Sequence, residues 1–107
     1  MDQTVKMSEL KAWVKKFCDD RGWDAPHTAK DLAIGLVTEG SELLEIFRFV
    51  PLEKEAEILS EKREAIADEL ADALYFILRF SQMYGFDLAE AVQKKLVKNE
   101  KRYPKLT

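Results

Sequence analysis

Apolar residues recur at intervals of three and four along most of this chain, and no segment alternates regularly between apolar and polar positions. Intervals of three and four are typical of amphipathic helices, whereas strict alternation is typical of strands. The pattern therefore predicts an all-α protein with four helices, over approximately residues 8–21, 28–49, 60–84 and 87–103. We expect these helices to form a four-helix bundle-type protomer.

The ends of the predicted helices are marked by capping residues and by helix breakers. Thr28 followed by Asp31, and Asp87 followed by Glu90, have the spacing of a capping box. Ser8 is the predicted start of the first helix. Residues that disfavour helix stand at the predicted ends: Gly22, Pro51, Gly85 and Pro104. The charged segment 52–64 is predicted to be a short exposed helix or a mobile connection, and we assign no chemistry to it.

The second half of the third predicted helix, residues 70–84, is apolar around most of its circumference. A helix of this kind has to be covered on several sides. The other helices of a chain this short would leave part of that surface in water. The sequence therefore predicts that the protomer assembles into a homo-oligomer.

Length and composition indicate one small domain, residues 1–107, in which 47% of the residues are hydrophobic and can build a core. The single cysteine, Cys18, excludes an internal disulfide. Because the chain shows neither a charged-then-apolar leader nor a membrane-spanning run, we expect a cytoplasmic protein with no membrane partner. A net charge of -3 disfavours sequence-independent nucleic-acid binding.

Two pairs of carboxylates lie on the two central predicted helices. Glu39 and Glu42 are three residues apart on the second helix, and Glu69 and Asp72 repeat this spacing on the third. Residues three apart on a helix differ by roughly 60° in azimuth and about 4.5 Å in height, so both side chains of a pair can reach one point. On a helical wheel Glu39 borders the apolar face of its helix, which predicts that the acids are partly enclosed.

Four carboxylates between two packed helices would repel one another and lose hydration unless they are protonated or neutralised by a cation. We therefore predict a metal site made of Glu39, Glu42, Glu69 and Asp72. An all-oxygen set suits Mg2+, with Mn2+ as a substitute, and Mg2+ commonly binds substrate phosphates as well. A single pair of this kind is usually solvated surface, but two pairs beside apolar faces favour a site. A di-iron site is disfavoured because the only histidine, His27, lies in a predicted loop.

Other residues could complete a nucleotide site. The last predicted helix contains a basic run with an asparagine inside it: Lys94, Lys95, Lys98, Asn99, Lys101 and Arg102. These cations could hold a polyphosphate, or could simply form a solvated face. Trp23, Phe49 and Phe76 could stack a nucleobase, although large aromatic residues at helical spacing are more often core. His27 either contacts ligand or packs before its helix.

Four segments in this order carry a resemblance to a known family. They are F-C-D-D-R-G-W-D-A-P-H-T-A-K-D-L, L-V-T-E-G-S-E-L-L-E-I-F-R-F, E-L-A-D-A-L-Y-F-I-L and D-L-A-E-A-V-Q-K-K-L-V-K-N-E-K-R-Y-P. With 26 residues between Glu42 and Glu69, the chain resembles the MazG-like all-α nucleoside triphosphate pyrophosphohydrolases, especially their dCTP-pyrophosphatase-like branch. The resemblance covers nearly the whole chain.

The resemblance implies roles for the residues named above. It implies that the four acids bind Mg2+, that Trp23, His27 and Phe49 contact nucleotide, and that three residues of the last helix face phosphate or base: Lys95, Asn99 and Arg102. Relatives of the dCTP type typically have tryptophan where Phe49 stands and tyrosine where Phe76 stands. The resemblance also implies homo-oligomers, commonly tetramers built as dimers of dimers, and a role in cleansing the nucleotide pool.

The leading hypothesis is therefore Mg2+-dependent hydrolysis of a nucleoside triphosphate, of dCTP or CTP type, to monophosphate and pyrophosphate. Water would attack the α-phosphorus, with Glu39 or Glu42 as the catalytic group that orients or deprotonates it. One alternative is a non-catalytic helical module that binds nucleotide or protein without turnover. Another is nucleic-acid binding through residues 94–105, which would weaken steeply with salt.

Overall fold

The computed structural model describes residues 1–23 and 28–106. Within these residues the elements are helical: α1 (Met7–Asp19), α2 (Ala29–Phe47), a short 3-10 turn η1 (Leu52–Lys54), α3 (Glu55–Glu61), α4 (Arg63–Tyr84) and α5 (Leu88–Arg102). No strand occurs in that part of the chain. The predicted all-α class is confirmed.

The charged segment after Pro51 corrects the predicted number of helices. It forms η1 and α3, so the described part of the chain contains five α-helices instead of the four expected. The helix predicted to begin near Ser60 begins instead at Arg63, because the backbone leaves helical geometry at Lys62, with φ -104° and ψ 20°. Hydrogen bonds from Lys62 N–H to Ile58 O (2.8 Å) and from Ile66 N–H to Lys62 O (2.8 Å) hold the two helices at this corner.

Local capping explains the other helix ends. At the start of α2 the Asp31 N–H donates to the Thr28 hydroxyl (3.1 Å) and the Thr28 N–H donates to the Asp31 carboxylate (3.3 Å), which confirms the predicted capping box. The Asp87 carboxylate accepts from the Glu90 N–H (2.9 Å) at the start of α5. Gly85 ends α4 with φ 74°, in the left-handed region that glycine tolerates best. The first helix begins at Met7, one residue before Ser8.

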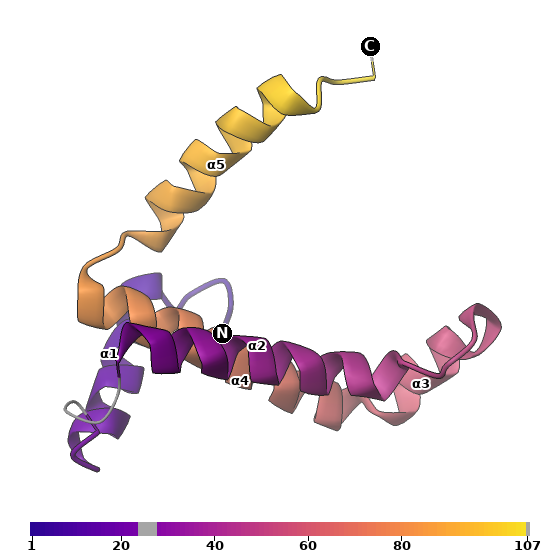
Figure 1. Ribbon diagram of the computed structural model, residues 1–107, viewed down its shortest axis with the longest axis horizontal. Helices are drawn as coiled ribbons and strands as arrows, with labels where there is room; N and C mark the ends of the chain where they lie inside the picture. Colours follow the sequence, from indigo (N-terminus) through magenta and orange to yellow (C-terminus); the bar gives the residue numbers. More distant parts are fainter. Residues whose placement is uncertain (24–27, 107) are drawn as a thin grey trace.

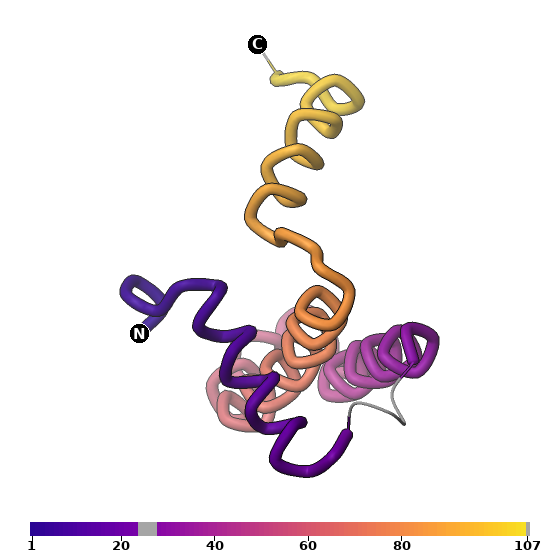
Figure 2. The backbone as a smooth tube through the Cα atoms, turned by 90° about the vertical axis from the view of Figure 1, so that its left-hand side faces the viewer, coloured from indigo at the N-terminus to yellow at the C-terminus, as the bar shows by residue number. Residues whose placement is uncertain are grey.

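Helices α2 and α4 lie side by side in opposite directions, and α1 crosses α4 (Figures 1 and 2). A close approach between α2 and α4 occurs at Gly35, where the ring of Phe76 occupies the space that a Cβ would need. Leu32 and Leu78 are buried in this region, and Cys18 is buried in α1. The α2–α4 pair is the framework on which the acidic residues are carried.

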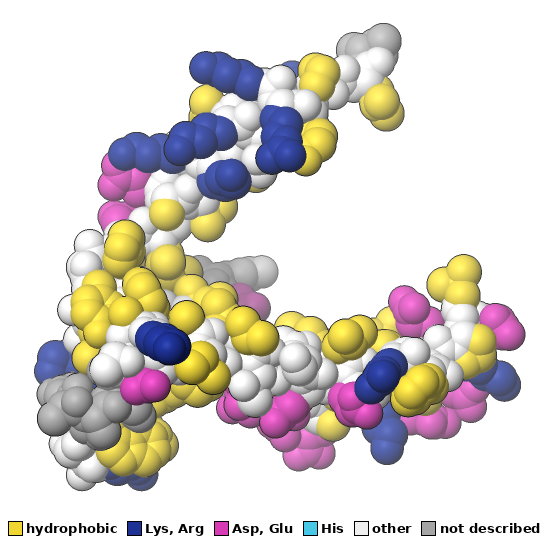
Figure 3. Space-filling model, viewed as in Figure 1, with side chains coloured by type: hydrophobic (Ala, Val, Ile, Leu, Met, Phe, Trp, Pro, Cys, Tyr) yellow, Lys and Arg dark blue, Asp and Glu magenta, His cyan; other side chains and the backbone are white. Residues whose placement is uncertain are grey.

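Helix α5 leaves this framework and extends away from it (Figure 1). The described helices of one chain therefore do not close into a bundle, so the predicted four-helix bundle is not confirmed. Hydrophobic side chains gather along the side of the α2–α4 pair that faces α5, and acidic side chains along the opposite side (Figure 3). In the described residues, no helix combines the length and the apolar character needed to span a membrane.

Candidate metal centre on helices α2 and α4

The acidic pairs of α2 and α4 meet at one place. Carboxylate oxygens of Glu39, Glu69 and Asp72 all lie within 4.8 Å of one another, and Glu39 and Glu69 are half-buried whereas Asp72 is exposed. The exposed Glu42 shares hydrogen bonds with the carboxyl groups of Glu39 and Glu69. The structure thus brings together three of the four residues predicted as metal ligands, with Glu42 beside them.

Crowding of negative charge changes the protonation of this cluster. The hydrogen bond with Glu42, followed by burial and the negative charge of Glu42, raises the pKa of Glu39 to about 7. Burial, followed by the hydrogen bond and charge of Glu42, raises the pKa of Glu69. Near neutral pH a cluster without a cation therefore retains protons that a bound cation would displace.

Two oxygen atoms of the cluster are buried without a hydrogen-bond donor: Oε2 of Glu39 and Oε2 of Glu69. A buried carboxylate oxygen is costly unless a donor or a cation satisfies it. Because every atom that could bind a metal here is a carboxylate oxygen, the arrangement fits a hard divalent cation such as Mg2+ or Mn2+.

A chain of aromatic rings leads away from one end of the cluster. Trp23 contacts Phe17 edge-on, with 5.7 Å between ring centroids, Phe17 contacts Tyr75 at 6.3 Å, and Tyr75 contacts Phe76 at 5.1 Å. The Phe76 ring rests on Gly35. Gly35 precedes Glu39 by four positions, and Phe76 follows Asp72 by four positions, which in each helix is about one turn. Phe76 therefore borders the carboxylates, although much of its ring packs against α2.

Tyr75 is directed toward α1. Its hydroxyl lies 3.1 Å from the sulfur of the fully buried Cys18. Burial, followed by this contact, raises the pKa of Tyr75 to about 12. The tyrosine therefore acts as a neutral packing residue between α1 and α4.

The remaining predicted substrate residues are not gathered at the cluster in one chain. Phe49 follows the end of α2 and is 82% exposed, with the Arg48 guanidinium 4.9 Å from the centre of its ring. His27 lies outside the described residues. The three predicted residues of the last helix lie on α5, which extends away from the cluster (Figure 1): Lys95, Asn99 and Arg102.

One residue near the cluster was not identified from the sequence. A cavity of about 460 Å³ continues from Glu42, with walls from α2, α3 and α4. Its lining residues are Glu42, Glu45, Ile46, Ile58, Lys62 and Ala65. Lys62, the residue before α4, stands seven residues before Glu69, an interval of about two helical turns. This interval was the available signal, but the segment was predicted to be a short exposed helix or a mobile connection, and no chemistry was assigned to it.

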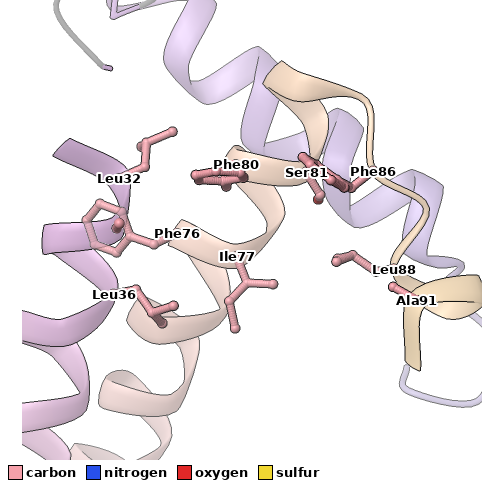
Figure 4. Close-up of a pocket in the computed structure, with 10 residues that line it drawn as sticks. Leu32, Leu36, Phe76, Ile77, Phe80, Ser81, Phe86, Leu88 and Ala91 are labelled. Atoms are coloured by element: carbon pink, nitrogen blue, oxygen red, sulfur yellow. The ribbon is translucent and has the colours of Figure 1, made fainter. Parts of the chain in front are cut away.

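A second cavity, of about 340 Å³, lies between α2, α4 and the start of α5 (Figure 4). The side chains around it are almost entirely apolar, among them Leu36, Phe76, Ile77, Phe80 and Leu88. It contains no group suited to a cation or a phosphate, so its chemistry is distinct from that of the acidic cluster, although Phe76 borders both.

Comparison with known proteins agrees with this geometry. The chain is 30% identical over 100 residues to dCTP pyrophosphatase 1 of Bos taurus and 29% identical over 100 residues to that of Homo sapiens. Each alignment covers 92% of this chain and 59% of the relative, so the chain spans little more than half the length of these proteins.

A solved structure is also similar over almost its entire length. The crystal structure of a pyrophosphatase from Archaeoglobus fulgidus has a TM-score of 0.88 and 38% sequence identity, covering 92% of this chain and 93% of that chain. Residues 27–107 match the family model of the MazG nucleotide pyrophosphohydrolase domain. This chain therefore belongs to the MazG nucleotide pyrophosphohydrolase domain family.

Proposed function

We propose that this protein hydrolyses a nucleoside triphosphate, of dCTP or CTP type, to the monophosphate and pyrophosphate, and so cleanses the nucleotide pool. The observation that carries the proposal is the cluster of Glu39, Glu42, Glu69 and Asp72, with its two partnerless buried oxygens, in a chain of this family. The activity named for the relatives supports the choice of base.

We propose that the four acids hold Mg2+, for which Mn2+ can substitute. When bound, the cation supplies a Lewis acid that acidifies water and offsets negative charge on the phosphate oxygens. Glu39 and Glu42 differ in exposure but share a hydrogen bond, so either can orient a water molecule at the edge of the cluster and accept its proton. The water oxygen bonds to the α-phosphorus, and the bond from that phosphorus to the bridging oxygen breaks with release of pyrophosphate.

A panel of ribo- and deoxynucleoside triphosphates with Mg2+ tests this function. We expect nucleoside monophosphate and pyrophosphate in equal amounts, fastest with dCTP or CTP, and no product when the cation is chelated. Release of orthophosphate with nucleoside diphosphate would move the attack to the γ-phosphorus and refute the mechanism. Nucleotide binding without any product would favour the non-catalytic module instead.

We also propose that a second copy of the chain covers the apolar side of the α2–α4 pair. Large apolar side chains of α2 and α4 are exposed in one chain, among them Val37, Leu44 and Leu70. An apolar surface of this extent is typical of an interface between subunits. Helix α5 is basic and carries its own exposed apolar residues, Val92 and Leu96, so it complements an acidic and apolar partner. In a dimer of dimers, we propose that α5 of a further chain brings Lys95, Asn99 and Arg102 to the acidic side.

Substitution of Leu44 tests the interface. Leu44→Glu places a charge on a residue that is 62% exposed in one chain, so it leaves the fold intact but weakens association about 100-fold. Sedimentation over a range of protein concentrations measures this effect. Leu52→Glu, at a position that is 82% exposed on η1, is the matched control and leaves association unchanged. A wild-type protein that is monomeric at all concentrations would refute the proposal.

A further inference from the structure

We propose that Lys62 binds the β- and γ-phosphates of the substrate, which leave as pyrophosphate. The substrate then lies along the acidic side of the α2–α4 pair, with its phosphate chain directed to the corner between α3 and α4 and its base toward Phe76. This inference rests on the proposed function and adds a binding residue and a direction to it.

The position of Lys62 is fixed by its backbone. It ends α3 and precedes α4, and the hydrogen bonds to and from Ile58 and Ile66 hold its Cα at the corner. The cavity of about 460 Å³ that it lines also includes Glu42, which contacts Glu39 and Glu69. This cavity is therefore a direct continuation of the carboxylate cluster.

Lys62 precedes the first residue of α4, and its carbonyl accepts the first hydrogen bond of that helix, from the Ile66 N–H (2.8 Å), so its Cα lies close to the helical path. Seven residues turn a helix through nearly two full turns, leaving a difference of only about 20° in azimuth and a rise of roughly 10.5 Å. Lys62 and Glu69 are separated by this interval. A phosphate chain held by a cation at Glu69 can therefore extend along the helix toward the lysine without crossing to another face.

The carboxylates that line the cavity explain why the terminal phosphates need a positively charged side chain there. Glu42 and Glu45 line the same space as Lys62 and would repel the terminal phosphates. Glu45 is paired with Arg48 at 3.9 Å, and Lys54 of η1 is paired with Glu57 at 3.7 Å. None of the ion pairs formed by residues 1–23 and 28–106 includes Lys62. Its ammonium group thus remains available for a phosphate, to which lysine binds as a point charge.

The opposite end of the cluster has a different chemistry and gives the substrate its direction. One turn beyond Glu39 and Asp72 lie Gly35 and the Phe76 ring, which continues into the aromatic contacts of Tyr75. An aromatic border suits a nucleobase and offers nothing to a highly charged phosphate chain. The two ends of the site therefore match the two ends of a nucleotide.

Lys62→Gln tests the contact because it removes the charge and keeps a side chain of similar length. We expect the KM for the triphosphate, and the inhibition constant of pyrophosphate, each to rise about tenfold, as for the loss of one charged hydrogen bond. The affinity for the nucleoside monophosphate should stay unchanged because it lacks the β- and γ-phosphates. Lys62→Arg should restore most of the loss. Lys54→Gln, at the exposed lysine of η1 that is paired with Glu57 at 3.7 Å, is the control and should behave as wild type.

The readouts separate this inference from the function on which it rests. Unchanged pyrophosphate inhibition in Lys62→Gln would overturn it, and so would an equal loss of monophosphate affinity. A wild-type protein that releases no pyrophosphate would refute the proposed function. Calorimetric titration with pyrophosphate of the Mg2+-loaded wild type and of Lys62→Gln would still test the contact between Lys62 and the phosphates. A dissociation constant about tenfold higher in the variant supports the contact, and equal dissociation constants refute it.

Discussion

Glu39→Gln is expected to reduce kcat/KM for the triphosphate by a factor on the order of 100 or more. The substitution keeps the size of the side chain but removes the negative charge and replaces one carboxylate oxygen with an amide nitrogen, which cannot bind a cation. Glu39 occupies the centre of the cluster, since it lies near Glu69 and Asp72 and shares a hydrogen bond with Glu42. Pyrophosphate release and the Mg2+ dissociation constant, measured on the same preparations, check the result.

The same substitution should make the metal-free protein more resistant to heat at high pH. The pKa of Glu39 is about 7 in the folded chain, above the value of about 4.3 for an unfolded glutamate. The folded state therefore favours the protonated form, and metal-free wild type loses stability as the pH rises from about 4.3 through about 7. Glutamine cannot ionise, so the variant lacks this loss. Mg2+ competes with the same protons, so wild-type Mg2+ affinity should fall as the pH drops below 7.

Glu57→Gln is the matched control. Glu57 is exposed on α3 and paired with Lys54 at 3.7 Å, and it belongs neither to the converging carboxylates nor to the lining of the cavity beside Glu42. Its substitution should leave turnover within about twofold, because an exposed ion pair contributes little. Equal losses in the two variants would show that the activity depends on the general charge of the surface. Full activity in Glu39→Gln would refute the metal centre proposed above.

The acidic cluster could be predicted from the sequence because it depends on local periodicity. Each pair is held together by one helix, and the apolar stripes of the two helices decide which sides face each other. The capping box of Thr28 and Asp31 and the glycine end at Gly85 are also local, and both are found in the structure. Features within one turn of a helix need no knowledge of the rest of the fold.

Other features depend on contacts between distant segments and could not be predicted in this way. The corner at Lys62 divides a segment whose composition favours continuous helix, and nothing in the spacing of its residues sets the direction of α5. The sequence left Phe76 as either a stacking residue or a core residue, and the structure shows that its ring fills the space above Gly35. Gly35, which is 41 positions away in the sequence, thus determines how much of that ring a ligand can reach.

Gly35→Ala is expected to destabilise the protein by about 1–3 kcal/mol, as overpacking of a close contact does. A Cβ at this position would lie 2.5 Å from Cζ and 2.6 Å from Cδ1 of Phe76, well inside van der Waals contact. Either the ring must turn out of its place or α2 must move away from α4. Movement of α2 would separate Glu39 from Asp72, so weaker Mg2+ binding should accompany the lower midpoint of unfolding.

Gly40→Ala provides the control because no atom lies within 4 Å of a Cβ built there. This exposed helical position should gain up to about 1 kcal/mol from the better helix propensity of alanine. Phe76→Leu combined with Gly35→Ala should recover part of the lost stability, since the smaller side chain leaves room for the new methyl group. Denaturant unfolding at a single protein concentration compares the four proteins. Equal stabilisation by the two glycine substitutions would show that the ring of Phe76 does not hold the helices at this distance.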